Sequence, residues 1–273
     1  MDKGFLDKVY YPFVKTRLHV SIMYAFILYN IIENHTSPKP YIPLVLAFSI
    51  WNYALYLFDR AYDAHLDNLS STKESLMGKY NRFFLIFSFL LAFVPIPILL
   101  LSGFSLFPFV LFLPVTFLYN MRIFPGKKAV KHFFFLKNLY SAIFIWTLPV
   151  VCVLKFYLHL PYTFVQIYLW FWSFVFTVLV GEIIWDIRDM DGDKQEGLKT
   201  VPIVLGLQKT KIIIVASILF IFVPISLWRH QFDWIFVAVF LLYGIFASPT
   251  IPKWIYHLPI FVTILKFLYI YLG

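Results

Sequence analysis

The sequence is poor in charged residues. Asp, Glu, Lys and Arg make up only 14% of its 273 residues, whereas 61% of the residues are hydrophobic and the mean hydropathy is +0.80. A soluble domain carries roughly 25% charged residues, so this chain has too few of them to cover a surface that faces water. The composition excludes an ordinary soluble protein and predicts an all-α polytopic membrane protein, because helices satisfy their own backbone hydrogen bonds in lipid.

Cysteine and polar linkers are also scarce. The single cysteine, Cys152, lies in an apolar run, which excludes an internal disulfide framework and any metal site built from several thiolates. No polar linker or low-complexity tract divides the chain, so we expect residues 1–273 to form a single domain. The N-terminus lacks the small-residue cleavage site of a signal peptide, and we expect the first hydrophobic segment to remain in the mature protein.

Long apolar stretches fill most of the sequence. A helix needs about 20 mainly apolar residues to cross the hydrocarbon core of a bilayer, and nine stretches approach that length. The predicted spans are residues 16–33, 41–58, 83–101, 103–121, 133–154, 160–185, 210–228, 233–248 and 254–272. We expect these helices to surround a central cavity, with kinks where prolines fall inside a span.

The basic residues indicate how the chain crosses the membrane. If the N-terminus is cytoplasmic, all but four of the 23 Lys and Arg residues fall in cytoplasmic segments. The exceptions are Lys39, Lys155, Arg229 and Lys266. This bias predicts a cytoplasmic N-terminus, and it explains the net charge of +9 as a topology signal rather than as a nucleic-acid-binding surface.

Acidic residues are the scarcest charged group, and they are clustered. The chain has 14 of them, and nine fall in two short windows, residues 59–67 and 182–196. Each window holds three aspartates at helical spacing: Asp59, Asp63 and Asp67 in the first, and Asp186, Asp189 and Asp193 in the second. Residues three or four apart share one face of a helix. We expect both windows to face the cytoplasm, at the ends of the second and sixth predicted helices. We interpret Glu182, Asp191 and Glu196 as bystanders, that is, as residues that take no part in the site.

The two aspartate clusters require a compensating positive charge. Like charges at this spacing repel one another, and the C-terminal end of a helix is the negative end of its dipole. Hard carboxylate oxygens suit magnesium, which commonly bridges one or two carboxylates to substrate phosphates. The alternative is a pair of solvated helix ends neutralised by the local cations Arg60, Arg188 and Lys194.

A calcium-binding loop is excluded for the second window. Residues 189–193 resemble the start of an EF-hand loop, but that pattern requires Gly at position 6 and Glu at position 12. Lys194 and Thr200 occupy those positions here.

Two aspartate clusters on helix ends that face the same side of a membrane suggest the two walls of a site for a magnesium diphosphate. With nine spans and both motifs, the chain resembles the UbiA-type intramembrane prenyltransferases over nearly its whole length. The first motif of that family is Asn-Asp-x-x-Asp-x-x-x-Asp, and Asp59 and Asp63 match its second half. Leu55 and Tyr56 replace the Asn-Asp pair, and Asn52 lies one turn earlier.

The second motif of the family is the more specific signal. It reads Asp-x-x-x-Asp, followed by Gly and a Thr-Leu-Pro-like run. Asp189, Asp193, Gly197 and residues 200–206 match it in this chain. Asp186 precedes the motif at a position that some branches of the family also fill with Asp.

A third resemblance lies between the fourth and fifth predicted helices. Family members place a Tyr and nearby basic residues there, and a Lys-Asn pair opens the fifth helix. Tyr119, Arg122, Lys137 and Asn138 correspond to these positions. Three further basic residues in this segment are interpreted as contacts to lipid headgroups: Lys127, Lys128 and Lys131.

The resemblance implies Mg²⁺-dependent transfer of an isoprenyl group from a prenyl diphosphate to a lipophilic acceptor buried in the bilayer, such as a quinone precursor, another aromatic compound or a lipid. The catalytic residues implied are Asp59, Asp63, Asp189 and Asp193. The same four would bind magnesium, joined by Asp186 and Asp67. The substrate-binding residues implied are Asn52, Arg60, Tyr119, Arg122, Lys137 and Asn138.

Two alternatives to prenyl transfer remain at this stage. Some branches of the family cyclise or hydrolyse the prenyl diphosphate instead. A protein of another class, a membrane transporter or magnesium channel, would also carry intramembrane ionisable residues, although such residues usually lie near the bilayer midplane.

Overall fold

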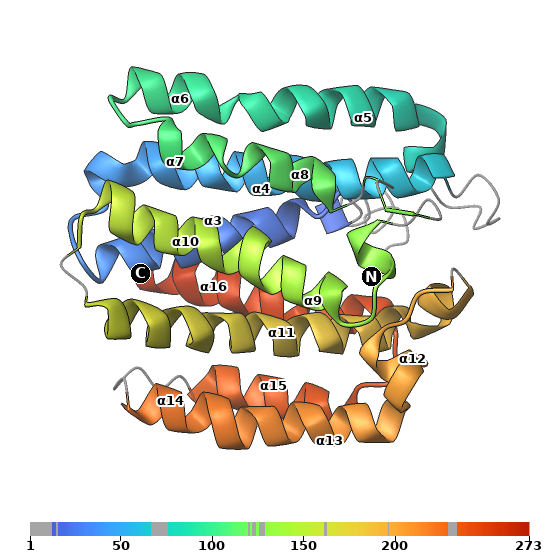
Figure 1. The fold of residues 1–273 in the computed structure, drawn as a ribbon. Helices are drawn as coiled ribbons and strands as arrows, with labels where there is room; N and C mark the ends of the chain where they lie inside the picture. The colour runs from blue at the N-terminus through green and yellow to red at the C-terminus, as the bar shows by residue number, and fades with distance from the viewer. Residues whose placement is uncertain are drawn as a thin grey trace. The chain divides into compact units, whose positions relative to one another are not determined.

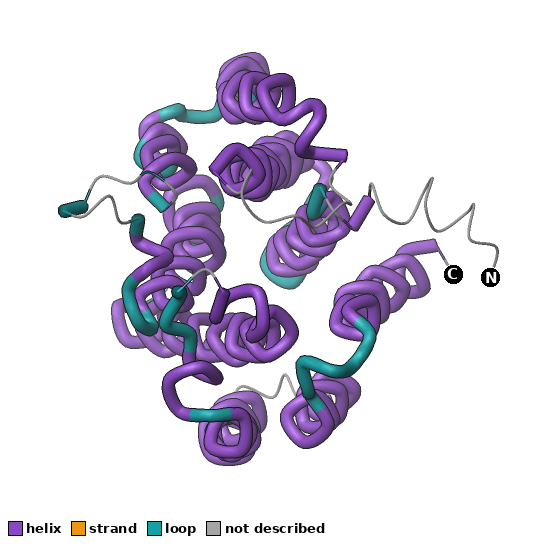
Figure 2. Tube along the Cα trace, turned by 90° about the vertical axis from the view of Figure 1, so that its right-hand side faces the viewer, coloured by secondary structure: helices purple, strands orange, loops and turns teal. Residues whose placement is uncertain are grey.

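The protein is described by a computed structural model. It places the backbone of residues 13–14, 16–66, 76–119, 121, 124–125, 129–160, 163–195, 197–228 and 234–272. Within these ranges the chain forms helices and connections but no β-strand, as Figure 2 shows. The prediction of an all-α fold is confirmed.

The helices group into two compact units. One comprises Met1–Asn120 with Ile260–Gly273, and the other comprises Met121–Pro259. That all 273 residues form one domain stays a prediction.

The first unit is built around helix α4 (Ile42–Leu66). Figure 1 shows α5 and α6 running end to end along α4. The helices that pack against α4 are α3 (Leu18–Glu33), α5 (Leu76–Phe93), α6 (Pro95–Leu101) and α8 (Leu113–Leu118). The unit also contains η2 (Lys39–Tyr41), α7 (Phe107–Val110) and most of α16 (Leu258–Leu272).

Aromatic side chains fill the core beside α4. Phe48 and Trp51 are fully buried on this helix, and both rings make edge contacts with Phe112. Such edge-to-face pairs contribute about 0.5–1.5 kcal/mol beyond the area that they bury. Because α4 continues to Leu66, Asp59 and Asp63 lie one turn apart on the same helix.

The predicted span 103–121 differs clearly from the structure. The stretch 103–121 contains two short helices, α7 and α8, separated by a turn at Leu111 and Phe112, instead of one long helix. Pro108 and Pro114 explain the difference, because proline lacks a backbone N–H and is tolerated in the first turn of a helix but not in its interior. Each of these prolines lies in the first turn of its short helix.

The second unit is built around α11 (Phe164–Gln195). On one side of α11 lies the nearly continuous segment α9 (Leu136–Tyr140), η4 (Ser141–Thr147), α10 (Leu148–Cys152) and η5 (Val153–Tyr157), in which η4 and η5 have π-helical geometry. α11 also packs against α12 (Val201–Leu205), α13 (Leu207–Ser217), η6 (Ile218–Phe222), α15 (Trp234–Phe246) and η7 (Lys253–His257) (Figure 1). η3 (Val130–His132) and α14 (Val223–Trp228) complete the unit.

Branched aliphatic side chains form the core between α11 and α13. Ile183, Ile184 and Ile187 of α11 pack in one buried cluster with Ile214 of α13. Gly244 lets α15 approach α13 closely, because a Cβ atom at this position would lie 2.8 Å from Ile214 Cγ2.

Four helical segments are long and apolar enough to cross a bilayer: Lys39–Tyr62, Arg82–Leu101, Leu136–Tyr157 and Phe164–Gln195. Three shorter helical segments are also apolar: Leu18–Glu33, Val237–Phe246 and Trp254–Leu265. Large apolar side chains such as Phe83, Ile86 and Leu90 are more than half exposed on α5, which suits contact with lipid rather than water. The count of nine spans stays a prediction.

Candidate active site

The C-terminal half of α11 carries a row of carboxylates on one face. Glu182, Asp186, Asp189 and Asp193 follow one another at intervals of four, three and four residues within a single helix. Asp186 is only 2% exposed and Asp193 only 9%, whereas Asp191 is exposed to solvent. The predicted alignment of the second aspartate window along one helix is therefore present in the structure.

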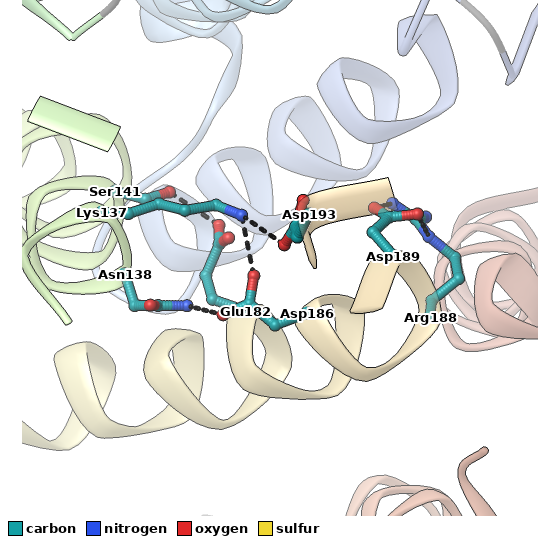
Figure 3. A network of polar contacts seen from close by, with 8 residues as sticks. All are labelled: Lys137, Asn138, Ser141, Glu182, Asp186, Arg188, Asp189 and Asp193. Carbon is teal, nitrogen blue, oxygen red and sulfur yellow. Dashed lines mark hydrogen bonds and ion pairs between the residues drawn. The ribbon is translucent and has the colours of Figure 1, made fainter. Parts of the chain in front are cut away.

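Lys137 and Asn138 bring two donors to this face (Figure 3). They lie in the first turn of α9, which begins after Phe135 adopts a positive φ of 61°. Lys137 Nζ lies 2.8 Å from Asp186 Oδ1 and 3.5 Å from Asp193 Oδ2. Asn138 Nδ2 donates to Asp186 Oδ2 at 2.8 Å, so both carboxylate oxygens of Asp186 are engaged.

Glu182 extends the same network by one helical turn. Ser141 Oγ, at the start of η4, donates to Glu182 Oε1 at 2.6 Å (Figure 3). The charge of Glu182 also acts on Lys137. Sequence reasoning treated Glu182 as a bystander and missed this contact. The available signal was its position four residues before Asp186, which places both side chains on one helix face.

Lys137 contributes one positive charge to this group of carboxylates. The ammonium of Lys137 faces three carboxylates, those of Glu182, Asp186 and Asp193. Withdrawing a carboxylate from water costs several kcal/mol unless a counter-charge compensates it. Carboxylates gathered at one place also supply the oxygen ligands that a divalent cation takes. Asn138 Oδ1, which is buried without a hydrogen-bond partner among the described residues, adds one more acceptor.

The donor chemistry of this network fits magnesium. Every candidate ligand is an oxygen, as magnesium prefers. Among the described residues, no three His, Cys, Asp or Glu side chains converge closely enough to enclose a metal ion on their own. Magnesium usually takes one or two carboxylates and completes its coordination with waters and substrate phosphates. The residues therefore suit an ion that binds together with a phosphorylated substrate.

Asp189 has a different partner from its neighbours on the same face. The guanidinium of Arg188 contacts both of its carboxylate oxygens (Figure 3). The Arg188 side chain is 4% exposed, whereas that of Asp189 is 33% exposed. Arg188 also lies over the ring of Trp185 and approaches His257. The carboxylate of Asp189 is thus oriented by Arg188 and remains partly exposed.

The residues of the first aspartate window lie on α4. Asp59 and Arg60 are half-buried, Asp63 lies in the last turns of the helix, and Asp67 lies outside the described residues. Asn52 is fully buried, and its Oδ1 accepts a hydrogen bond from Ser21 Oγ of α3 at 3.0 Å. The structure thus gives Asn52 a contact between two helices of the first unit.

The other predicted substrate-binding residues lie near the connection after α8. Tyr119 follows α8 directly and is 9% exposed. Arg122 lies outside the described residues. Of the predicted site residues whose side chains the structure describes, it brings four together: Lys137, Asn138, Asp186 and Asp193.

Comparisons with known proteins point to one family. The sequence profile described as the UbiA prenyltransferase family matches residues 21–256. A UbiA homologue from Aeropyrum pernix K1, solved in its apo form, has a similar fold with a TM-score of 0.59 and 15% sequence identity, covering 94% of this chain and 98% of that one. A UbiA homologue from Archaeoglobus fulgidus, solved with DMAPP and Mg²⁺, gives a TM-score of 0.56 and 14% identity, covering 92% of this chain and 93% of that one. No curated protein sequence matches the chain.

Proposed function

The chain belongs to the UbiA prenyltransferase family, and we propose that it catalyses the magnesium-dependent transfer of an isoprenyl group from a prenyl diphosphate to a lipophilic acceptor. The observation that carries the proposal is the convergence of Lys137 and Asn138 on the carboxylates of α11. Basic and acidic groups at one place suit a substrate that combines phosphate oxygens with a divalent cation. The Archaeoglobus homologue, which binds DMAPP and Mg²⁺, supports the same substrate class.

In the proposed site, two groups of aspartates would hold the magnesium ions. Asp186, Asp189 and Asp193 form one group, and Asp59, Asp63 and Asp67 form the other. When bound, magnesium would neutralise the negative charge that develops on the departing diphosphate, a contribution of several kcal/mol. The acceptors on α11 are oxygen atoms only, which agrees with this choice of ion.

The remaining polar residues of the site bind and orient. Lys137 donates charge-assisted hydrogen bonds to diphosphate oxygens, with Arg60 and Arg122 as further cations and Asn52 and Tyr119 as further contacts. Asn138 and Lys137 together keep the Asp186 carboxylate in place. The apolar residues of the surrounding helices exclude water, which strengthens each of these electrostatic interactions.

The overall reaction balances with the loss of one proton. The bond between the first prenyl carbon and the diphosphate oxygen breaks, and the diphosphate leaves with the electron pair. The prenyl carbon then bonds to the acceptor, which releases a proton. A quinone precursor, another aromatic compound or a lipid suits this role, because the acceptor must dissolve in the bilayer.

The proposal includes a topology. The chain is an integral membrane protein of one domain with nine spans, and its N-terminus and site opening lie on the cytoplasmic side. The distribution of Lys and Arg residues supports this orientation.

Turnover by the purified protein in lipid nanodiscs tests the function. Dimethylallyl, geranyl, farnesyl and geranylgeranyl diphosphate would each be offered with Mg²⁺ and a panel of aromatic and lipid acceptors. Mass spectrometry should find an acceptor whose mass increases by one prenyl group, and EDTA should abolish that product. Formation of only a prenyl alcohol or a cyclised hydrocarbon would instead identify a hydrolase or cyclase, and ion flux in vesicles without turnover would identify a transporter.

A further inference from the structure

Arg188 is held in one orientation by three different contacts. Its Nε and Nη2 atoms contact the two carboxylate oxygens of Asp189, and its Nη1 atom lies 3.4 Å from His257 Nε2. Its guanidinium carbon lies 5.4 Å from the centre of the Trp185 ring, within the range of a cation–π contact. A planar guanidinium that is fixed on its edges and on one face cannot rotate freely.

The contact between Arg188 and His257 defines the state of the histidine. A guanidinium can only donate hydrogen bonds, so His257 Nε2 must accept from Arg188 Nη1. The neutral ring then carries its proton on Nδ1. His257 is 5% exposed, and its ring also lies 6.4 Å from that of Trp185. The histidine therefore supports the side of the guanidinium that faces away from Asp189.

His257 is held in turn by the connection between α15 and α16. Tyr256 OH accepts a hydrogen bond from Ser248 N at 2.8 Å and donates one to Ser248 O at 2.9 Å. Tyr243 OH donates to Ile255 O. These hydrogen bonds hold residues 248–257 in a compact turn. The backbone of this turn therefore fixes the position of His257.

We propose that Arg188 and His257 are positioning residues for Asp189: His257 orients Arg188, and Arg188 orients the carboxylate of Asp189 toward the cation of the diphosphate site. The inference rests on the proposed function, since it needs a cation for Asp189 to bind. The contacts with Arg188 fix the orientation of the Asp189 carboxylate. The Asp189 side chain is one-third exposed, so it is not enclosed by the protein.

This arrangement assigns a function to a connection that carries no acidic residue. Neighbouring groups that orient a metal ligand typically change metal affinity by about 10–100-fold when they are removed. Residues 248–257 would act on the site in this way although they contain none of the predicted ligands.

Binding of Mn²⁺ in the presence of inorganic diphosphate tests the inference without any turnover. The free Mn²⁺ signal in electron paramagnetic resonance would be titrated for the wild-type chain and for Arg188→Gln, His257→Ala and His257→Gln. We expect Arg188→Gln to weaken Mn²⁺ binding about 10–100-fold. His257→Ala should also weaken it. His257→Gln should restore most of the affinity, because the Gln side chain presents an acceptor to Arg188 Nη1.

Two controls separate positioning from general damage. Lys199→Gln removes an exposed cation from the connection after α11 and should leave Mn²⁺ binding unchanged. Asp189→Asn should remove the effect of Arg188→Gln, so that the double variant binds no more weakly than Asp189→Asn alone.

Unchanged or tighter Mn²⁺ binding in Arg188→Gln and His257→Ala would overturn the inference, since tighter binding would mean that Arg188 competes with the metal for Asp189. If the wild-type chain itself failed to bind Mn²⁺ and diphosphate, that result would contradict both the proposed function and this inference.

Discussion

Lys137 Nζ lies 2.8 Å from Asp186 Oδ1, although the two residues stand 49 positions apart in the chain and belong to different helices. The contact joins the first turn of α9 to the polar face of α11. It also links two motifs that the sequence shows separately, the Lys-Asn pair and the second aspartate window. The pair is therefore both a part of the candidate site and a part of what holds the second unit together.

Removing the lysine should destabilise the protein. In Lys137→Met, the Asp186 carboxylate, which is 2% exposed, loses its ammonium partner, and breaking a buried ion pair in this way costs about 3–5 kcal/mol. We expect a lower unfolding temperature in detergent, measured by intrinsic fluorescence. The double variant Lys137→Met with Asp186→Asn should recover much of the loss, because it removes the most deeply buried carboxylate that had lost its partner. An equal loss in the single and double variants would contradict this account of the pair.

The aspartates of both windows should be needed for turnover. Asp59→Ala, Asp189→Ala and Asp193→Ala should each lower magnesium-dependent release of diphosphate by a factor on the order of 100 or more, since a catalytic metal supplies several kcal/mol. Each variant should remain folded in detergent. Asp191→Ala is the matched control, because this exposed aspartate lies off the shared face and should leave release unchanged. Wild-type-like turnover in any of the first three variants would remove that residue from the metal site.

Two glycine substitutions should change stability in opposite directions. At Gly244, an added Cβ would lie 2.8 Å from Ile214 Cγ2, and such overpacking typically costs about 1–3 kcal/mol. At Gly181, the nearest atom lies 3.8 Å away, so Gly181→Ala should keep the roughly 1 kcal/mol gain in helix propensity. Thermal unfolding should therefore shift down in Gly244→Ala and up in Gly181→Ala. A rise in both variants would show that α13 moves aside at no cost.

Membrane orientation can be tested through the single cysteine. Cys152 is 5% exposed, and its replacement by Ala would leave a chain without thiols. In that background, a membrane-impermeant maleimide applied to intact cells should label Lys39→Cys. It should label Lys199→Cys only after the membrane is opened, because the proposed topology places Lys199 in the cytoplasm. The reverse pattern would invert the proposed topology.

Local sequence patterns predicted the helices and the internal alignment of the second window. Asp186, Asp189 and Asp193 lie on one helix because their spacing of three and four matches the helical repeat. The prediction for the stretch 103–121 was wrong. Its hydropathy predicted one long span, whereas Pro108 and Pro114 lie in the first turns of two short helices.

The partners of the aspartates were not predictable in the same way. The position of Glu182 four residues before Asp186 indicates a shared helix face, but it does not reveal that Ser141 donates to Glu182. Arg188 stands next to Asp189 in the chain and three residues after Trp185, but its contact with His257 depends on how residues 248–257 fold back onto α11. Side chains separated by many residues meet only through tertiary packing, and the local spacing of residues in the sequence does not reveal such contacts.

By itself the sequence determined that the chain is helical and apolar, and which carboxylates share a helix face, because hydropathy and helical spacing are local properties. Only the tertiary structure decided that Lys137 faces Asp186 and that His257 contacts Arg188. The physical reason is that a buried charge is stabilised by whatever lies within a few ångströms of it, and the packing of α9, α11 and η7 sets those distances.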